Sequence, residues 1–215
     1  MPISETARAV ACVSFATSAL FMFLLVALHL LRPDLDPSWR FISEYELGDY
    51  GWVMQVAFFT LSLSCVAFCV AIVSQVRMIA GYIGLALVIL AAFGMALAGA
   101  FVPDPLNNLH EVGAQLDHLP FGAPLINWSL SRNPAWFPAK RMLRWTAFLP
   151  LLGLVLFVGS LIVMLPANGG KPGPTVLAGW PNRVMIVLHC AWLMPVARFA
   201  MKLAKGARQG RVGTS

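Results

Sequence analysis

Charge is scarce in this sequence. Asp, Glu, Lys and Arg together make up only 11% of the 215 residues, and only nine of them are acids. A soluble domain usually carries about 25% charged residues on a surface that faces water. The scarcity therefore excludes an ordinary soluble protein. The four cysteines form no paired framework, so they do not indicate a redox compartment.

Apolar residues take the place of the missing charge. They make up 59% of the chain, and the mean hydropathy is +0.77. Crossing a bilayer takes about 20 apolar residues, and the backbone in hydrocarbon must satisfy its own hydrogen bonds as a helix. We therefore predict an all-α polytopic membrane protein, a single transmembrane domain over 1–215. Its six spans are predicted at 9–31, 52–76, 78–102, 109–130, 143–165 and 184–204. The first is too long for a signal-peptide core, so we expect it to be retained.

Basic residues orient the predicted spans. Eleven of the fifteen Lys and Arg residues fall on the side of the N-terminus. Because basic loops stay in the cytoplasm, both termini are predicted to be cytoplasmic, in a cell (inner) membrane of bacterial type. The span at 109–130 is the weakest, because polar residues dilute its first half, but a five-span chain would place the basic 132–144 loop outside. The net charge of +6 comes largely from these loops and the tail, so we expect no nucleic-acid partner.

Two of the spans contain residues that affect helix packing. The span at 78–102 carries small residues, including Gly81, Gly84 and Gly99, and small residues let helix backbones approach closely in lipid. In the span at 109–130, Pro120 and Pro124 each remove a backbone donor. We expect close packing by the first of these spans and a kink in the second.

Several different short motifs are spread along the chain from the end of the first span to the last span. They are Ser43-Glu44-Tyr45-Glu46-Leu47-Gly48 before Trp52; Phe101-Val102-Pro103-Asp104-Pro105; Leu109-His110; and Pro181-Asn182-Arg183 followed by Trp192 and Ala197-Arg198. In their order and placement the chain resembles an uncharacterised bacterial and archaeal membrane family, domain of unknown function 998. Val102 departs from the threonine usual at that position. The resemblance implies a six-helix fold and no established activity.

Polar residues in the outer half of the predicted bundle are the candidate site. Counting depth at 1.5 Å per residue separates them into two layers. The rim layer, a candidate ligand-binding set, holds His29, Glu44, Asp104, His110 and Arg183. The deeper layer, a candidate catalytic or metal-binding set, holds Asp117, His118 and His189. Ionisable groups at such depth usually face the bundle interior or a watery cavity.

The loop before the second span has its own pattern. Ser43 followed three residues later by Glu46 fits a capping box for a short interfacial helix. We therefore expect Glu44 and Glu46 to be solvated or to cap that helix.

Three functions fit this constellation. The first is a non-catalytic accessory or binding protein for a lipid or lipid-like molecule, with membrane lipids and a membrane-protein complex as partners. The second is a metal-assisted lipid hydrolase, because imidazoles with a carboxylate suit zinc; the lack of a His-x-x-x-His pair counts against it. The third is a proton-coupled carrier that uses Asp117 and His118 as a relay. A haem site between His118 and His189 is a weaker alternative.

Overall fold

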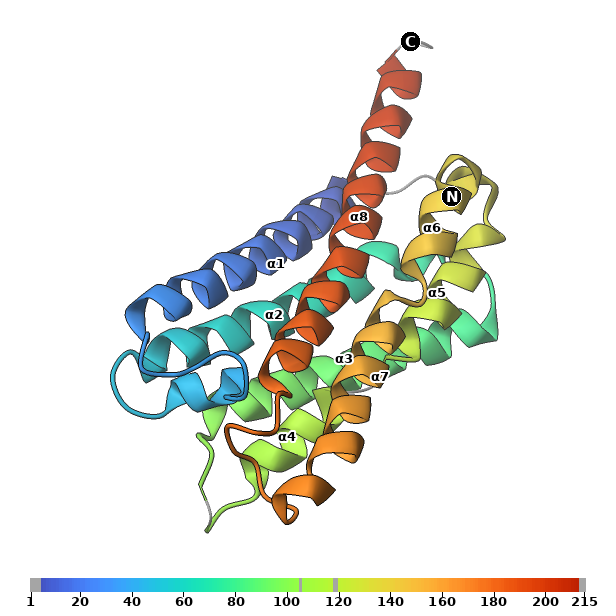
Figure 1. The fold of residues 1–215 in the computed structure, drawn as a ribbon. Coiled ribbons are helices and arrows are strands. Elements are labelled where there is room, and N and C mark those ends of the chain that lie inside the picture. The colour runs from blue at the N-terminus through green and yellow to red at the C-terminus, as the bar shows by residue number, and fades with distance from the viewer. Residues whose placement is uncertain (1–4, 105, 118–119, 213–215) are drawn as a thin grey trace.

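The chain folds into a bundle of helices (Figure 1). The computed structural model describes residues 5–104, 106–117 and 120–212. Its α-helices are α1 (Glu5–Leu31), α2 (Gly51–Ile72), α3 (Ile79–Ala100), α4 (Leu109–Asp117), α5 (Gly122–Ser131), α6 (Lys140–Thr146), α7 (Leu149–Met164) and α8 (Gly179–Val212). Short 3-10 helices are η1 (Ile42–Glu46), η2 (Val73–Gln75), η3 (Pro134–Ala139) and η4 (Pro166–Asn168). The described residues contain no β-strand, so the predicted all-α class is confirmed.

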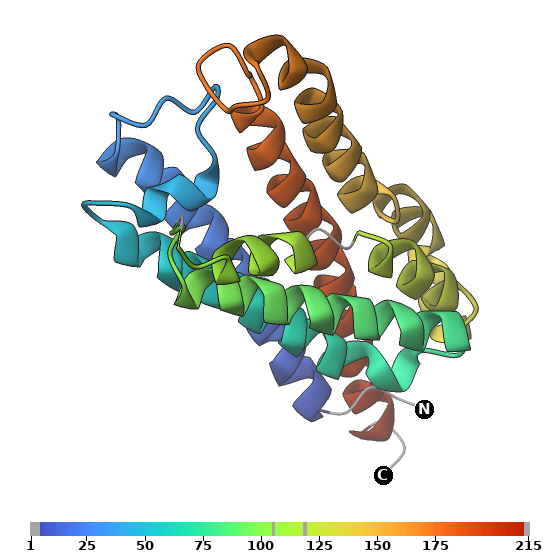
Figure 2. The ribbon, with the colours of Figure 1, turned by 90° about the horizontal axis from the view of Figure 1, so that it is seen from below.

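Most helices pack against helices close to them in the chain, and α8 also packs against α1, which is far from it in the chain. α1 packs against α2 and α8, α2 against α3, α3 against α4 and α5, and α7 against α8. The start of α1 and the end of α8 lie at the same end of the bundle (Figures 1 and 2). That end also holds Arg77 and Arg132, and we call it the basic end. The opposite end, with loop 32–50, is called the acidic end.

The chain is a membrane protein, and its described residues include five helical segments long and apolar enough to cross a bilayer. They are Glu5–Leu31, Gly51–Gln75, Ile79–Ala100, Pro134–Met164 and Gly179–Ala204. The predicted spans at 9–31, 52–76, 78–102 and 184–204 match four of them. The remaining segment, Pro134–Met164, begins earlier than the predicted span at 143–165, because it includes η3 and α6 before α7.

The prediction of one continuous span over 109–130 is wrong. The region forms two short helices, α4 with 9 residues and α5 with 10. At 1.5 Å per residue neither can cross about 30 Å of hydrocarbon alone. A Cβ built on Gly113 would lie 2.7 Å from Gly94 O, and one on Gly122 would lie 2.9 Å from Gly84 O. α4 and α5 therefore follow α3 from its end back to its start, and the chain makes a sixth, broken passage.

The break follows from the prolines, although it exceeds the expected kink. α4 ends at Asp117, and Pro120 stands in the turn before α5. Pro124 lies in the first turn of α5, where a missing N–H leaves no hydrogen bond unmade. Helical hydrogen bonding is thus interrupted at the first proline and resumes at the second.

Small residues of α3 provide the expected close packing. A Cβ on Gly84 would lie 2.8 Å from Gly122 O and 2.9 Å from the Ile126 side chain. A Cβ on Gly81 would lie 2.5 Å from the Ser129 side chain. α5 therefore sits against α3 with no room for a side chain between them.

Replacing Gly84 with alanine is expected to lower the free energy of unfolding by about 1–3 kcal/mol, because an overpacked contact forces backbones apart. The measurement is unfolding in detergent. Gly159→Ala in α7 is the matched control, because a Cβ there meets nothing within 4 Å. Equal stability of the two variants would show that α3 and α5 are not packed backbone to backbone.

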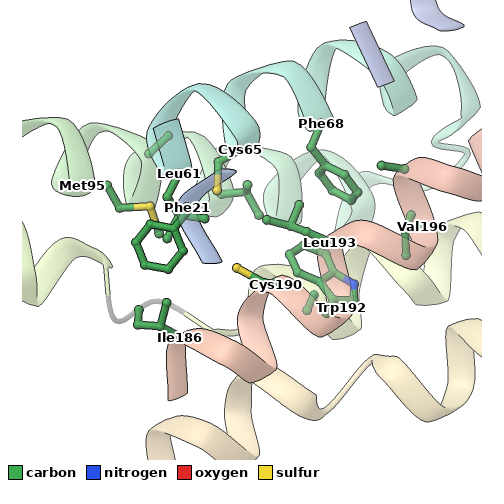
Figure 3. Close-up of a cluster of buried hydrophobic side chains, with 14 of the residues drawn as sticks. Phe21, Leu61, Cys65, Phe68, Met95, Ile186, Cys190, Trp192, Leu193 and Val196 are labelled. Atoms are coloured by element: carbon green, nitrogen blue, oxygen red, sulfur yellow. The ribbon is translucent and has the colours of Figure 1, made fainter. Parts of the chain in front are cut away.

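The core lies where α1, α2, α3 and α8 meet. Figure 3 shows Phe21, Cys65, Phe68, Met95 and Trp192 converging from these four helices. Trp192 packs inside the bundle, with 1% of its surface exposed. Polar ties add to this packing, since the Ser64 hydroxyl donates to the Ser14 carbonyl of α1 (2.8 Å).

Candidate functional site

Loop 32–50 folds over the acidic end and includes η1. Glu44 accepts a hydrogen bond from the Phe41 N–H (2.9 Å) and pairs with Arg40 Nη1 (2.5 Å). The capping box predicted from Ser43 and Glu46 is therefore wrong, because η1 begins two residues earlier, with Phe41 at the N-cap position and Glu44 as its capping acid. Glu44, a predicted ligand contact, lies at the edge of this loop with its side chain partly exposed.

Arg183 connects α8 to α1 and to loop 32–50. It is 3% exposed. Its Nε donates to His29 Nε2 (2.8 Å), its Nη1 to the carbonyls of Arg40 (2.6 Å) and Gly179 (3.0 Å), and its Nη2 to Tyr45 Oη (3.2 Å). We call Arg183, His29 and Tyr45 the arginine cluster. Because each guanidinium nitrogen donates to a protein acceptor, this cluster holds the loop to the helices.

The neighbours of His29 fix its tautomer. Its Nδ1 lies 2.7 Å from the Leu25 carbonyl, an acceptor only, so Nδ1 carries the proton and donates. Nε2 then offers its lone pair to Arg183. Both ring nitrogens of His29 therefore have partners within the protein.

A buried carboxyl–imidazole pair lies beside the arginine cluster. Oε2 of Glu46 lies 3.2 Å from Nδ1 of His110, and the Glu46 side chain has no exposed surface. Nδ1 of His110 also lies 2.8 Å from the Phe101 carbonyl and 3.1 Å from that of Ala98. Burial raises the pKa of the Glu46 carboxyl above its ordinary value, and the contact with His110 opposes the shift. The expectation that Glu46 is solvated or caps η1 is therefore wrong.

The predicted rim layer thus divides into two clusters. His29 and Arg183 meet in one, and His110 lies in the other. The prediction did not include Tyr45 and Glu46 as site residues. They are adjacent in η1, and Tyr45 belongs to the arginine cluster while Glu46 pairs with His110. Asp104 joins neither; its carboxylate accepts from the Leu106 N–H (2.9 Å) in the turn after α3.

The deeper predicted layer is described only in part. Nε2 of His189 lies 3.5 Å from Sγ of Cys65, and its ring meets that of Trp192 edge to face. The Asp117 side chain and all of His118 lie outside the described residues. Among the residues that are described, no three His, Cys, Asp or Glu side chains gather as metal ligands. Zinc and haem sites built on Asp117, His118 and His189 stay predictions.

A groove of about 730 Å³ opens beside these clusters at the acidic end. Loop 32–50 and α4 form one side, and α7 with the start of α8 forms the other. Its polar lining includes Arg40, Glu44, His110, Glu111, Gln115 and Asn182, and its apolar lining includes Trp39, Phe41, Leu154, Phe157 and Val158. Asn182 also ties α8 to the loop, because its Oδ1 accepts from the Ile42 N–H (3.0 Å). The groove therefore has a polar rim and an apolar wall on one helix.

Comparison with known proteins agrees with the resemblance seen in the motifs. A search of curated proteins gives no match, and a search of solved structures gives none either. The model of a family described as "Protein of unknown function (DUF998)" matches residues 15–198. That range runs from the first turns of α1 to the middle of α8 and includes both clusters and the groove. The chain therefore belongs to the DUF998 family.

Proposed function

We propose that this membrane protein binds a lipid-like amphiphile in the groove at the acidic end, without transforming it. The observation that carries the proposal is the division of the lining into a polar rim and an apolar wall. Ligand sites commonly occupy about 300–1,000 Å³ and are mostly apolar with a few placed polar groups. The groove, at about 730 Å³, has both properties.

The position of α7 supports lateral entry of a hydrocarbon chain. The groove lies between α4 and α7. α4 packs against α3 and α7 packs against α8, so these two helices border the groove while each is held by a different neighbour. Val158 is 38% exposed and Phe157 lies beneath it, both on the segment that crosses the bilayer. An acyl chain lying along α7 would cover this apolar surface.

Charges on the rim favour a headgroup that carries an amine. The described lining has two carboxylates, Glu44 and Glu111, and one arginine, Arg40. Arg40 is already paired with Glu44, and Glu111 is exposed. The rim is thus negative overall, which favours an ammonium over a bare phosphate. Phosphatidylethanolamine, with an ammonium beside its phosphate, has this chemistry.

Filling the groove should remove the bound lipid. We expect Val158→Trp to reduce co-purifying phosphatidylethanolamine about tenfold, because the indole occupies the apolar wall. Native mass spectrometry of the detergent-purified protein measures this. Val155→Trp is the matched control: it makes the same change on the same helix, at a position that is 59% exposed and does not line the groove. Equal lipid retention by the two variants would rule out the groove as the binding site.

The hydrolase and carrier hypotheses use different residues. Both depend on Asp117 and His118, whose side chains lie outside the described part of the chain. Neither gains support from the groove, and the membrane-lipid partner, a protein complex and the inner-membrane location remain proposals.

A further inference from the structure

A second groove, of about 620 Å³, lies at the basic end. It is formed by α5, by α6 and by the start of α7. Its described lining includes three cations, Arg132, Lys140 and Arg144, and no acidic residue. The charge of its rim is therefore opposite to that of the first groove.

Buried polar contacts fix the floor of this groove. Asn127 Nδ2 donates to the Leu143 carbonyl (2.8 Å), and Asn127 Oδ1 accepts from Trp192 Nε1 (3.0 Å). These bonds tie α5 to α6 and to α8. Ser129 Oγ accepts from the Arg77 N–H (2.9 Å), which ties α5 to the turn before α3. The groove is thus a fixed feature of the fold.

No described acidic side chain is paired with any of the three cations. The two arginine–carboxylate pairs and the Glu46–His110 contact of the described residues include none of Arg132, Lys140 and Arg144. Lys140 Nζ lies 3.7 Å from the centre of the Phe137 ring, and Arg132 Cζ lies 6.0 Å from that of Trp128. Such contacts orient a cation and leave its N–H donors available to a ligand.

Exposed aromatic residues indicate the depth of the groove. Trp128 and Phe148 line it and are 46% and 59% exposed, and Trp145 beside them is 74% exposed. The amphipathic rings of tryptophan, here Trp128 and Trp145, concentrate where headgroups meet hydrocarbon. The cations therefore lie at headgroup level, and the apolar residues Leu125, Leu143 and Phe148 lie along the adjoining wall.

We propose that this groove binds an anionic phospholipid of the leaflet at the basic end. Arg132 and Arg144 would receive the phosphate, because a guanidinium matches its oxygens with two parallel donors. The acyl chains would lie against the apolar wall. The basic end is the predicted cytoplasmic end, where anionic lipids concentrate. This site is separate from the first groove and does not rest on the function proposed for it.

Binding of phosphatidylglycerol and phosphatidylethanolamine to the delipidated full-length protein in detergent, measured by native mass spectrometry, tests the site. We expect the wild type to bind both lipids, with phosphatidylglycerol bound in this groove. Arg132→Gln/Arg144→Gln is expected to weaken phosphatidylglycerol binding at least tenfold and to leave phosphatidylethanolamine binding unchanged. Arg8→Gln/Lys202→Gln is the matched control, because it removes two exposed charges at the same end outside the groove.

An equal loss in both double variants would overturn the proposal, since it would indicate diffuse attraction to basic residues. No loss in either, or no binding of phosphatidylglycerol by the wild type, would overturn it as well. If the groove variant fails to fold, Arg144→Gln alone, at an exposed position, replaces it. Its expected loss is about threefold, and an unchanged affinity would again contradict the site.

Discussion

Replacing Arg183 with leucine is expected to lower the free energy of unfolding by about 3–5 kcal/mol. Leucine removes every donor that the cluster uses, so His29 Nε2, Tyr45 Oη and the carbonyls of Arg40 and Gly179 lose a partner. A buried acceptor left without a donor costs about 1–3 kcal/mol. Some of these acceptors will recover water as the loop loosens, which keeps the total below the full sum.

Chemical unfolding of the purified protein in detergent measures this loss. Arg40→Leu is the control, because it makes the same change at a partly exposed side chain whose ion pair is worth less than about 1 kcal/mol. Arg183→Lys should fall between the two, since lysine keeps the charge and lacks the fork of donors. If Arg183→Leu proved as stable as Arg40→Leu, the arginine cluster would not hold loop 32–50 to the bundle.

The helices could be predicted from the sequence because the bilayer imposes their length. A run of about 20 apolar residues has few structures other than a spanning helix. The break between α4 and α5 was indicated by Pro120 and Pro124, although the pattern predicted a kink. The extent of the break depends on how α4 and α5 pack against Gly94 and Gly84 of α3. Hydropathy carries no information about that packing.

The site was predicted less well, because counting residues gives depth and not direction. His29 and His110 share a depth, yet His29 faces Arg183 and His110 faces Glu46. His189 was placed at mid-depth, and its direction toward Cys65 appears only in the structure. The sequence did contain a signal for the missing partners, since Tyr45 and Glu46 stand together inside the motif shared with the family.

Glu46 was missed for a different reason. A carboxylate in a polar loop is usually solvated, and most loops run over the surface. Here the loop turns back over α4, so the burial of Glu46 results from a long-range contact with His110. The motif at residues 43–48 contains Glu46, but neither it nor the hydropathy of the loop identifies His110 as the residue in contact.

Replacing Glu46 with glutamine is expected to stabilise the protein as the pH rises. Burial raises the pKa of the Glu46 carboxyl above its ordinary value of 4.5. Below about pH 4.5 the carboxyl is protonated in both the folded and the unfolded chain, so it has no pH-dependent effect. Above that pH the unfolded chain releases the proton while the folded chain retains it. Wild-type stability then falls, by at most about 1.4 kcal/mol per pH unit, until the pH passes the raised pKa.

Glutamine does not titrate, so the stability of Glu46→Gln relative to the wild type should increase over this window and then level off. Unfolding in detergent between about pH 4 and pH 8 measures the difference, in which the contributions of titrating groups that do not contact Glu46 largely cancel. His110 does not cancel, because the Glu46 carboxyl raises its pKa, and the loss of that effect changes the difference in the same direction. Glu111→Gln supplies the baseline, because it removes a charge from α4 at an exposed position. A difference that instead decreases with pH would mean that an ionised Glu46 paired with a charged His110 stabilises the fold more than burial costs. The pair would then be a structural ion pair, and the assignment of a proton to the buried carboxyl would be wrong.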